Sequence, residues 1–300
     1  MQKWTTDDIP SLEGRNAIVT GTGGLGLEDA IALSKAGAKV IIAGRNPKKG
    51  QSAIASIRQQ VPGADVSFEL LDLADLQSIA AFAERISGQI DKLDILINNA
   101  GIMTPPRRLT TNDNFELQFG TNYLGHFALT ARLLPLIKKA KGRVVSLSSV
   151  AARNGEINFD DLQAKNKYIP MPAYAQSKLA CLTFAFELQK QSDINGWGIS
   201  SIAAHPGISR TELFEDKRSL IGRARKYAWF IFQPAARGAL TTLYAATSPQ
   251  AQPGKYYGPH AFHEIRGYPR EAFVPQNALD SAASNRLWKV SEQLTDIKFE

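Results

Sequence analysis

Short apolar runs alternate with longer helix-type segments along almost the whole chain, and this alternation constrains the fold more than any other feature. The apolar runs lie at 16–20, 39–43, 66–71, 93–97, 143–147 and 198–204, with a short one at 255–257. The segments between them predict helices over 25–36, 48–60, 75–90, 115–139, 173–191 and 236–247. The runs lack polar–apolar alternation, so we expect strands buried on both faces, as in a parallel sheet covered by helices. This order predicts an α/β fold with a doubly wound, seven-stranded parallel sheet.

A single domain over residues 1–300 is predicted, because no linker, internal repeat or low-complexity tract interrupts the pattern. Apolar residues make up 44% of the chain and charged residues 21%, a balance that is ordinary for globular proteins and argues against disorder. In a doubly wound sheet, ligands bind at the carboxyl ends of the strands. The candidate residues below cluster at those ends.

The charge and the cysteine content indicate which kinds of partner and which cellular compartment to expect. The formal net charge is +7, but the basic residues are scattered and form no nucleic-acid motif, so we expect no nucleic-acid partner. The only cysteine, Cys181, cannot form an intrachain disulfide, which favours a reducing compartment. The chain does not start like a signal peptide, and no apolar run approaches the roughly 20 residues of a membrane span. We therefore expect a cytoplasmic chain without an integral membrane segment.

A glycine-rich turn follows the first predicted strand and opens the first predicted helix. Its sequence, Thr-Gly-Thr-Gly-Gly-Leu-Gly, fits the pattern G-x-G-x-x-G. Glycines permit a tight turn and close approach of a pyrophosphate to the backbone, while the helix N-terminus supplies N–H groups. The turn predicts a Rossmann-type dinucleotide site, and a plain strand-to-helix turn is the alternative. The residues expected to contact the pyrophosphate are Gly21, Gly23, Gly24, Leu25 and Gly26.

The end of the second predicted strand bears on the choice of nucleotide. A site specific for NAD usually places an acidic residue there to hold the ribose hydroxyls. This chain instead has Arg45 and Asn46, with Lys48 and Lys49 close behind. Because Arg45 can pair with a 2′-phosphate, we expect NADP(H) in preference to NAD(H). A solvated loop arginine is the alternative.

Polar and small residues end the third and fourth predicted strands. Asp72 can accept from the adenine amino group while the backbone N–H of Leu73 donates, although Asp72 is also a candidate N-cap, a role that Asp75 can take instead. At the fourth strand, Ala100 and Gly101 allow a nucleotide to lie against the backbone. Asn99 either contacts that nucleotide or braces the neighbouring strands.

Tyr174 and Lys178 are one helical turn apart and share a helix face, so the phenol and the ammonium are neighbours. A close positive charge favours phenolate, which lets Tyr174 exchange a proton with a substrate oxygen. A serine pair ends the fifth predicted strand and can polarise that oxygen. Asn122 is a candidate holder of a water that links Lys178 to solvent, or a polar helix residue that bonds to nearby backbone.

The four histidines receive structural interpretations. His260 and His263 have metal-ligand spacing, but cysteine and acidic partners are scarce nearby, so no metal site is expected. His126 is interpreted as a helix-face residue and His205 as part of the backbone turn before Pro206.

The chain resembles the short-chain dehydrogenase/reductase family over essentially its whole length. The resemblance rests on the glycine-rich turn, Asn-Asn-Ala-Gly at 98–101, Ser149, Tyr174-x-x-x-Lys178 and Pro206-Gly207, in the family's order. The stretches 119–127, 157–162 and 173–180 are similar to the retinol-dehydrogenase-like and protochlorophyllide-reductase-like branch. One departure is that the glycine-rich turn is one residue shorter than the family's usual turn.

This resemblance implies roles for individual residues. The catalytic set would be Ser149, Tyr174, Lys178 and Asn122, with Ser149 chosen because the family's serine is the second of the pair. Pro206 and Gly207 would lie against the nicotinamide, and Thr211 would bond its carboxamide. The segment 212–233 would form a substrate lid, and family members commonly form dimers or tetramers through their long helices.

The resemblance predicts an NADP(H)-dependent oxidoreductase that acts on a carbonyl or alcohol. Aromatic residues in 212–233 favour a hydrophobic small-molecule substrate, while membrane-surface contact and inward packing of these rings are the alternatives. Reduction of a carbon–carbon double bond is a second enzymatic hypothesis. A non-catalytic dinucleotide-binding regulator is the third hypothesis, and a complete Ser149, Tyr174 and Lys178 set argues against it.

Overall fold

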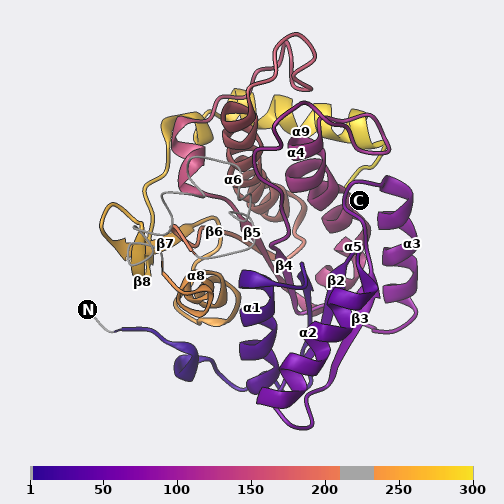
Figure 1. Ribbon diagram of the computed structural model, residues 1–300, viewed down its shortest axis with the longest axis vertical. Coiled ribbons are helices and arrows are strands. Elements are labelled where there is room, and N and C mark those ends of the chain that lie inside the picture. The colour runs from indigo at the N-terminus through magenta and orange to yellow at the C-terminus, as the bar shows by residue number, and fades with distance from the viewer. Residues whose placement is uncertain (1–2, 210–232, 300) are drawn as a thin grey trace.

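In the computed structural model, which describes residues 3–209 and 233–299, one sheet runs through the centre with strand order β3-β2-β1-β4-β5-β6-β7-β8 (Figure 1). The strands are β1 Asn16–Thr20, β2 Lys39–Gly44, β3 Val66–Leu70, β4 Ile95–Asn98, β5 Arg143–Leu147, β6 Ser200–Ala204, β7 Tyr256–Ala261 and β8 Arg266–Glu271. The pairings from β3 to β7 are parallel. This arrangement confirms the doubly wound α/β fold, with the order reversing between β1 and β4.

The prediction of seven strands was wrong by one, because β8 pairs antiparallel with β7 at the edge of the sheet. Its sequence, Arg-Gly-Tyr-Pro-Arg-Glu, is polar and contains glycine and proline, so it lacks the apolar run that marks the inner strands. Proline is tolerated in an edge strand, where its missing N–H costs no ladder bond. All six residues of β8 are exposed or partly exposed.

Helices cover both faces of the sheet. Their bounds are α1 Gly24–Lys35, α2 Pro47–Gln60, α3 Leu76–Ser87, α4 Leu117–Phe119, α5 Gly125–Ala140, α6 Pro170–Asn195, α8 Ala235–Thr247 and α9 Ser281–Thr295. Alternate residues of β1 enter opposite cores: Ile18 packs with α3, α5 and α6, whereas Ala17 and Val19 pack with α1, α2 and α8. The central strands are therefore buried on both faces, which explains their uninterrupted apolar sequences.

Two helical regions differ from the sequence prediction. The helix expected over 115–139 is divided into α4, a π-helical turn at Gly120–Leu124 and α5. The close approach of Gly125 to the Leu73 backbone shows how tightly this region packs, since a Cβ at residue 125 would collide with the Leu73 carbonyl. The second difference is α9, which the strand–helix alternation did not predict.

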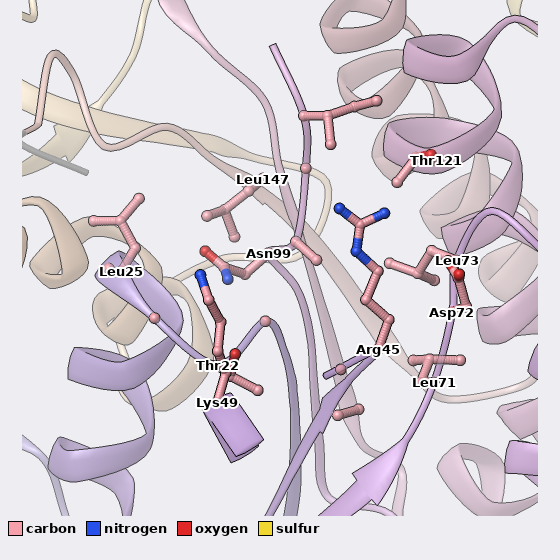
Figure 2. Close-up of a pocket in the computed structure, with 18 of the residues that line it drawn as sticks. Thr22, Leu25, Arg45, Lys49, Leu71, Asp72, Leu73, Asn99, Thr121 and Leu147 are labelled. Atoms are coloured by element: carbon pink, nitrogen blue, oxygen red, sulfur yellow. The ribbon is translucent and has the colours of Figure 1, made fainter. Parts of the chain in front are cut away.

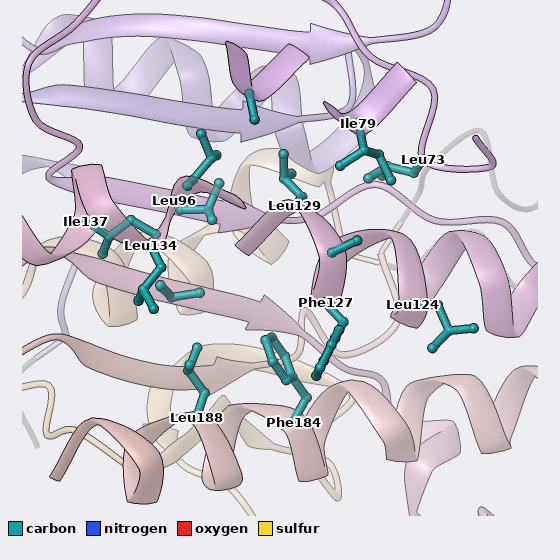
Figure 3. Packing of buried hydrophobic residues seen from close by; sticks show 14 of the residues in the cluster. Leu73, Ile79, Leu96, Leu124, Phe127, Leu129, Leu134, Ile137, Phe184 and Leu188 are labelled. Atoms are coloured by element: carbon teal, nitrogen blue, oxygen red, sulfur yellow. The ribbon is translucent and has the colours of Figure 1, made fainter. Parts of the chain in front are cut away.

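An aromatic cluster holds α9 against α5 and α6. Phe127 of α5 and Phe184 of α6 lie side by side with ring centroids 5.5 Å apart (Figure 3). Trp288 of α9 contacts both rings, with ring centroids 5.3 and 6.0 Å apart, and the Phe299 ring packs at a tilt against Trp288, with centroids 4.5 Å apart. A short hydrogen bond of 2.6 Å joins the buried hydroxyls of Tyr123 and Ser291. Within the described residues, no helix combines the length and apolar character needed to cross a membrane.

Candidate active site

A cavity of about 380 Å³ opens at the carboxyl ends of the strands, on both sides of the point where the strand order reverses. Most of the sequence-predicted site residues line it. They are Gly21, Gly23, Gly24, Leu25, Arg45, Asn46, Asp72, Leu73, Asn99, Ala100, Gly101, Tyr174, Lys178 and Pro206. The fold therefore brings residues more than 180 positions apart in the sequence to one cavity, at the place where α/β sheets bind ligands.

Five predicted residues do not line this cavity or cannot be placed. Gly26 serves the packing of α1, because a Cβ at this position would lie 2.6 Å from Asn99 Nδ2 and 2.8 Å from the Gly21 carbonyl oxygen. Ser149, Asn122 and Gly207 lie outside the cavity lining. Thr211 and nearly all of the predicted lid lie outside the described residues.

The glycine-rich turn fits a pyrophosphate, although it is one residue short. Gly23 is the N-cap of α1, and no described side chain caps this helix, so its first N–H groups remain available to an anion. Gly21 has a φ of +100°, and a Cβ there would lie 2.8 Å from Asn99 Nδ2. A side chain at Gly21 would therefore displace Asn99, which lines the cavity beside the turn.

Thr20 and His126 form a hub under the turn, which sequence reasoning missed. The Thr20 hydroxyl accepts from the backbone N–H groups of Asn99 and Ala100, each at 2.9 Å, and lies 2.9 Å from His126 Nε2. His126 Nδ1 lies 2.9 Å from the Asn122 carbonyl oxygen, which can only accept. Nδ1 therefore carries the imidazole proton, and Nε2 accepts from Thr20. His126 thus links the end of β1, where the glycine-rich turn begins, to the π-helical turn.

Asn99 has the bracing role that was one of its two predicted roles, and it also lines the cavity. Its side-chain amide donates to the Thr20 carbonyl oxygen at 2.6 Å, which ties the end of β4 to the end of β1. The sequence does not indicate that Thr20 pairs with His126, because threonines in strands and histidines in helices are common without such a contact.

Burial of His126 makes the folded protein sensitive to acid. Burial lowers the pKa of His126 to about 4, the largest cause being desolvation of its charged form. The unfolded chain binds this proton near pH 6.5 and the folded chain does not, so stability falls as the pH drops through that window. We expect the stability loss between pH 7 and pH 5 to be about 2 kcal/mol smaller in His126→Gln than in the wild type. Urea unfolding at the two pH values measures this difference, and equal losses in both proteins would contradict it.

The end of the cavity beside β2 contains two cationic side chains. Arg45 follows β2 and Lys49 lies in the first turn of α2, and both side chains extend into the cavity (Figure 2). Lys48 does not line the cavity. Asn46 caps α2 by accepting from the Lys49 backbone N–H at 3.1 Å. Two positive side chains at this end fit a phosphate group.

Asp72 and Asp75 have different positions beside that end. Asp75 is the N-cap of α3 and accepts from the N–H groups of Gln77 and Ser78, at 2.9 and 3.1 Å. Asp72 lines the cavity, and its Oδ1 accepts from the Ala74 N–H at 2.9 Å. Because Asp75 caps α3, Asp72 Oδ2 is not needed for that cap.

At the other end of the cavity, Tyr174 and Lys178 lie one turn apart on α6 and are almost fully buried, with exposed fractions of 8% and 6%. Lys178 Nζ donates to the Leu147 carbonyl oxygen at 3.0 Å, which fixes the ammonium at the end of β5. Gly101 leaves room for the neighbouring Asn122 side chain, since a Cβ at residue 101 would lie only 3.1 Å from Asn122 Oδ1.

The serine pair is divided between two functions. The buried Ser148 hydroxyl donates to the Lys178 carbonyl oxygen at 2.8 Å, so its proton is engaged in packing the strand end against α6. Ser149 is partly exposed and caps the short 3₁₀ helix Val150–Asn154, accepting from the Ala151 N–H at 3.2 Å. This cap uses the hydroxyl oxygen and leaves its proton available to a ligand. Of the two serines, Ser148 is the one that lines the cavity.

Asn122 bonds to nearby backbone, which was one of its two predicted roles. Its side-chain oxygen accepts from the Ile102 N–H at 2.8 Å, and its amide donates to the Ile102 carbonyl oxygen at 3.0 Å and to the Ser177 hydroxyl at 2.9 Å. It therefore holds the segment after β4 against α6, immediately beside Lys178. Within the described residues, no group of three or more metal-ligating side chains occurs.

Comparisons with known proteins agree with this geometry. The short chain dehydrogenase family profile matches residues 15–221. Retinol dehydrogenase 12 of Mus musculus is 40% identical over 293 residues, which cover 96% of this chain and 89% of that protein. Polyprenol dehydrogenase of Mus musculus is 37% identical over 296 residues, with 96% and 85% covered. A solved structure of an uncharacterized Mycobacterium paratuberculosis protein aligns over the whole length of both chains with a TM-score of 0.82 and 36% identity. The chain therefore belongs to the short-chain dehydrogenase/reductase family of oxidoreductases, in its retinol-dehydrogenase-like branch.

Proposed function

We propose that this protein is an NADP(H)-dependent oxidoreductase that transfers hydride between nicotinamide and the carbonyl or alcohol carbon of a hydrophobic small molecule. The observation that carries the proposal is one cavity with two chemically distinct ends. The glycine-rich turn, Arg45 and Lys49 form the end suited to phosphates, and Tyr174 and Lys178 form the end suited to proton transfer. A protein that only binds a dinucleotide has no need of a buried phenol and ammonium at the second end.

Each residue of the second end has a separate task in this proposal. Bound NADPH supplies the hydride, and the protein must supply the proton and hold the substrate oxygen. Tyr174 donates its phenolic proton to that oxygen during reduction and accepts it back during oxidation. The proposal also assigns the Ser149 hydroxyl as a donor to this oxygen, from its position directly after the cavity-lining residue Ser148. Lys178 is held by the Leu147 carbonyl oxygen one helical turn from Tyr174, and it places a positive charge near the oxygen that loses the proton.

Loss of NADPH absorbance with a panel of hydrophobic ketones, aldehydes and enones tests the activity. We expect turnover of ketones or aldehydes, and of the corresponding alcohols in the reverse direction with NADP⁺. Turnover of enones alone, with loss of the carbon–carbon double bond, would favour the alternative reductase hypothesis. Cofactor binding without turnover of any compound would favour the regulator.

Arg45 is the residue proposed to select the phosphorylated cofactor. We expect Arg45→Ala to weaken NADPH binding about 10- to 100-fold, because a charge-assisted hydrogen bond contributes about 1.5–3 kcal/mol. NADH binding should change little, since NADH has no 2′-phosphate. Fluorescence titration of both cofactors measures the two affinities. Lys48→Ala is the matched control, because it removes a neighbouring positive charge that does not line the cavity. Equal losses for NADPH and NADH would contradict the assignment.

Three further features of the proposal concern the protein outside the cavity. The segment 212–233 would act as the substrate lid, and its described end, Gln233, is buried and donates to the Pro206 carbonyl oxygen at 2.6 Å. The unpaired, buried Cys181 is in keeping with a cytoplasmic, reducing environment. We also propose that the protein forms a dimer or tetramer, which light scattering measures. The helix α9 covers the aromatic face of α5 and α6. A second copy would need a different face.

A further inference from the structure

The carboxylate of Glu264 joins three segments that are distant in the sequence, and it lies outside the cavity. Its Oε2 atom is 2.9 Å from His205 Nε2 and 2.6 Å from an Arg153 guanidinium nitrogen. Its Oε1 atom accepts from the Phe273 N–H at 2.7 Å. Glu264 has a φ of +67° in the turn between β7 and β8, where Phe262 and His263 are also left-handed. This strained turn directs the side chain into the fold.

The His205 side of this contact leads to the turn after β6. His205 Nδ1 accepts from the Gly207 N–H at 3.2 Å, so the proton of the neutral imidazole lies on Nε2 and is donated to Glu264. The ring is fully buried, and Gly258 is required beside it, because a Cβ at this position would collide with Nε2. Glu264 thereby fixes the tautomer that holds the backbone N–H of Gly207.

The Arg153 side leads to the turn after β5. Arg153 lies in the short helix Val150–Asn154, whose N-cap is Ser149. Its guanidinium also donates to the His263 carbonyl oxygen at 3.3 Å and lies over the Phe273 ring, 5.6 Å from the centroid. The helix that begins at Ser149 is therefore fastened to the same carboxylate as the Gly207 turn.

We propose that Glu264 is a positioning residue, whose single oxygen Oε2 fixes the Ser149 segment relative to the Pro206–Gly207 turn. This inference rests on the proposed function, in which Ser149 holds the substrate oxygen and Pro206–Gly207 lies against the nicotinamide. Hydride transfer needs both partners held at a short, fixed separation, and a misplacement of about 1 Å can cost roughly 100-fold in rate. A charged acceptor suits this task, because hydrogen bonds to ionised groups are shorter and stronger than neutral ones.

The variant Glu264→Gln tests the proposal with little change of size. Its amide oxygen can still accept from Phe273, but the amide NH₂ cannot accept from His205 and Arg153. We expect kcat to fall about 10- to 100-fold, while the affinity for NADPH, measured by fluorescence titration, stays close to the wild-type value. The control is Glu271→Gln, which removes the same charge from the same hairpin at an exposed ion pair with Lys255. An unchanged kcat per NADPH-binding site in Glu264→Gln would overturn the proposal.

Hydrogen exchange supplies a second readout that does not depend on turnover. In Glu264→Gln, we expect the segments 149–155 and 205–209 to lose protection together, whereas Glu271→Gln should leave both unchanged. Loss of protection confined to the β7–β8 turn would show a merely local role and overturn the proposal. If the wild-type protein turns over no compound, the proposed function fails, and the exchange result alone decides whether Glu264 couples the two segments.

Discussion

Replacing Tyr174 with phenylalanine is expected to lower kcat by about 10²- to 10⁴-fold, the usual contribution of a positioned general acid or base. The substitution removes only the phenolic hydroxyl from a side chain that is 8% exposed, so the ring keeps its packing on α6. NADPH affinity should stay close to the wild-type value, because the glycine-rich turn and Arg45 lie at the other end of the cavity. Single-turnover kinetics with NADPH, together with fluorescence titration of the cofactor, separates the two quantities.

A matched variant distinguishes loss of a catalytic proton from loss of any phenol. Tyr257 lies on β7 and does not line the cavity, and its hydroxyl accepts from the Gln252 N–H at 2.9 Å. Tyr257→Phe should reduce stability by about 1 kcal/mol, the typical net contribution of one hydrogen bond, with kcat unchanged. A near-normal kcat in Tyr174→Phe would end the assignment of Tyr174 as the proton donor.

The parts of the fold that were predictable are those in which local sequence and tertiary burial agree. The run Asn-Ala-Ile-Val-Thr of β1 is apolar because its two faces enter two different cores. By contrast, β8 is stabilised by its partner β7 and is polar, so its sequence resembles that of a loop. The π-helical turn at Gly120–Leu124 was not predicted either, because the helical pattern of the sequence continues through these five residues.

The candidate site shows the same division. The residues at strand ends were predictable because the topology of a doubly wound sheet gathers those ends at one edge. The pairs Thr20–His126 and His205–Glu264 were not, since they join residues 106 and 59 positions apart through single side-chain contacts. Periodicity and spacing report on neighbours along a helix or strand, and they contain no information on such partners. The missed residues are consequently those that position the predicted ones.

The attachment of helix α9 to α5 and α6 depends on a few aromatic rings, so a single substitution among them should have a large effect on stability. Trp288 is 8% exposed and contacts Phe127, Phe184 and Phe299. Its indole N–H donates to Glu292 Oε1 at 3.0 Å, so the ring is buried without an unsatisfied donor. The rings beneath it form part of the larger core, which also includes Leu134 of α5. Replacing the Trp288 side chain with a smaller one would therefore open a cavity at the centre of this contact.

We expect Trp288→Ala to lower the free energy of unfolding by about 3–5 kcal/mol, the typical cost of truncating a large buried aromatic side chain. Trp288→Phe retains a ring and should lose less. Ile194→Ala on α6 is the control, because Ile194 is 67% exposed and a surface substitution usually changes stability by no more than about 0.5 kcal/mol. Urea unfolding followed by circular dichroism measures all three variants without depending on tryptophan fluorescence. A loss below about 1 kcal/mol in Trp288→Ala would mean that α9 is not held by this cluster, and that the aromatic face of α5 and α6 is stabilised without it.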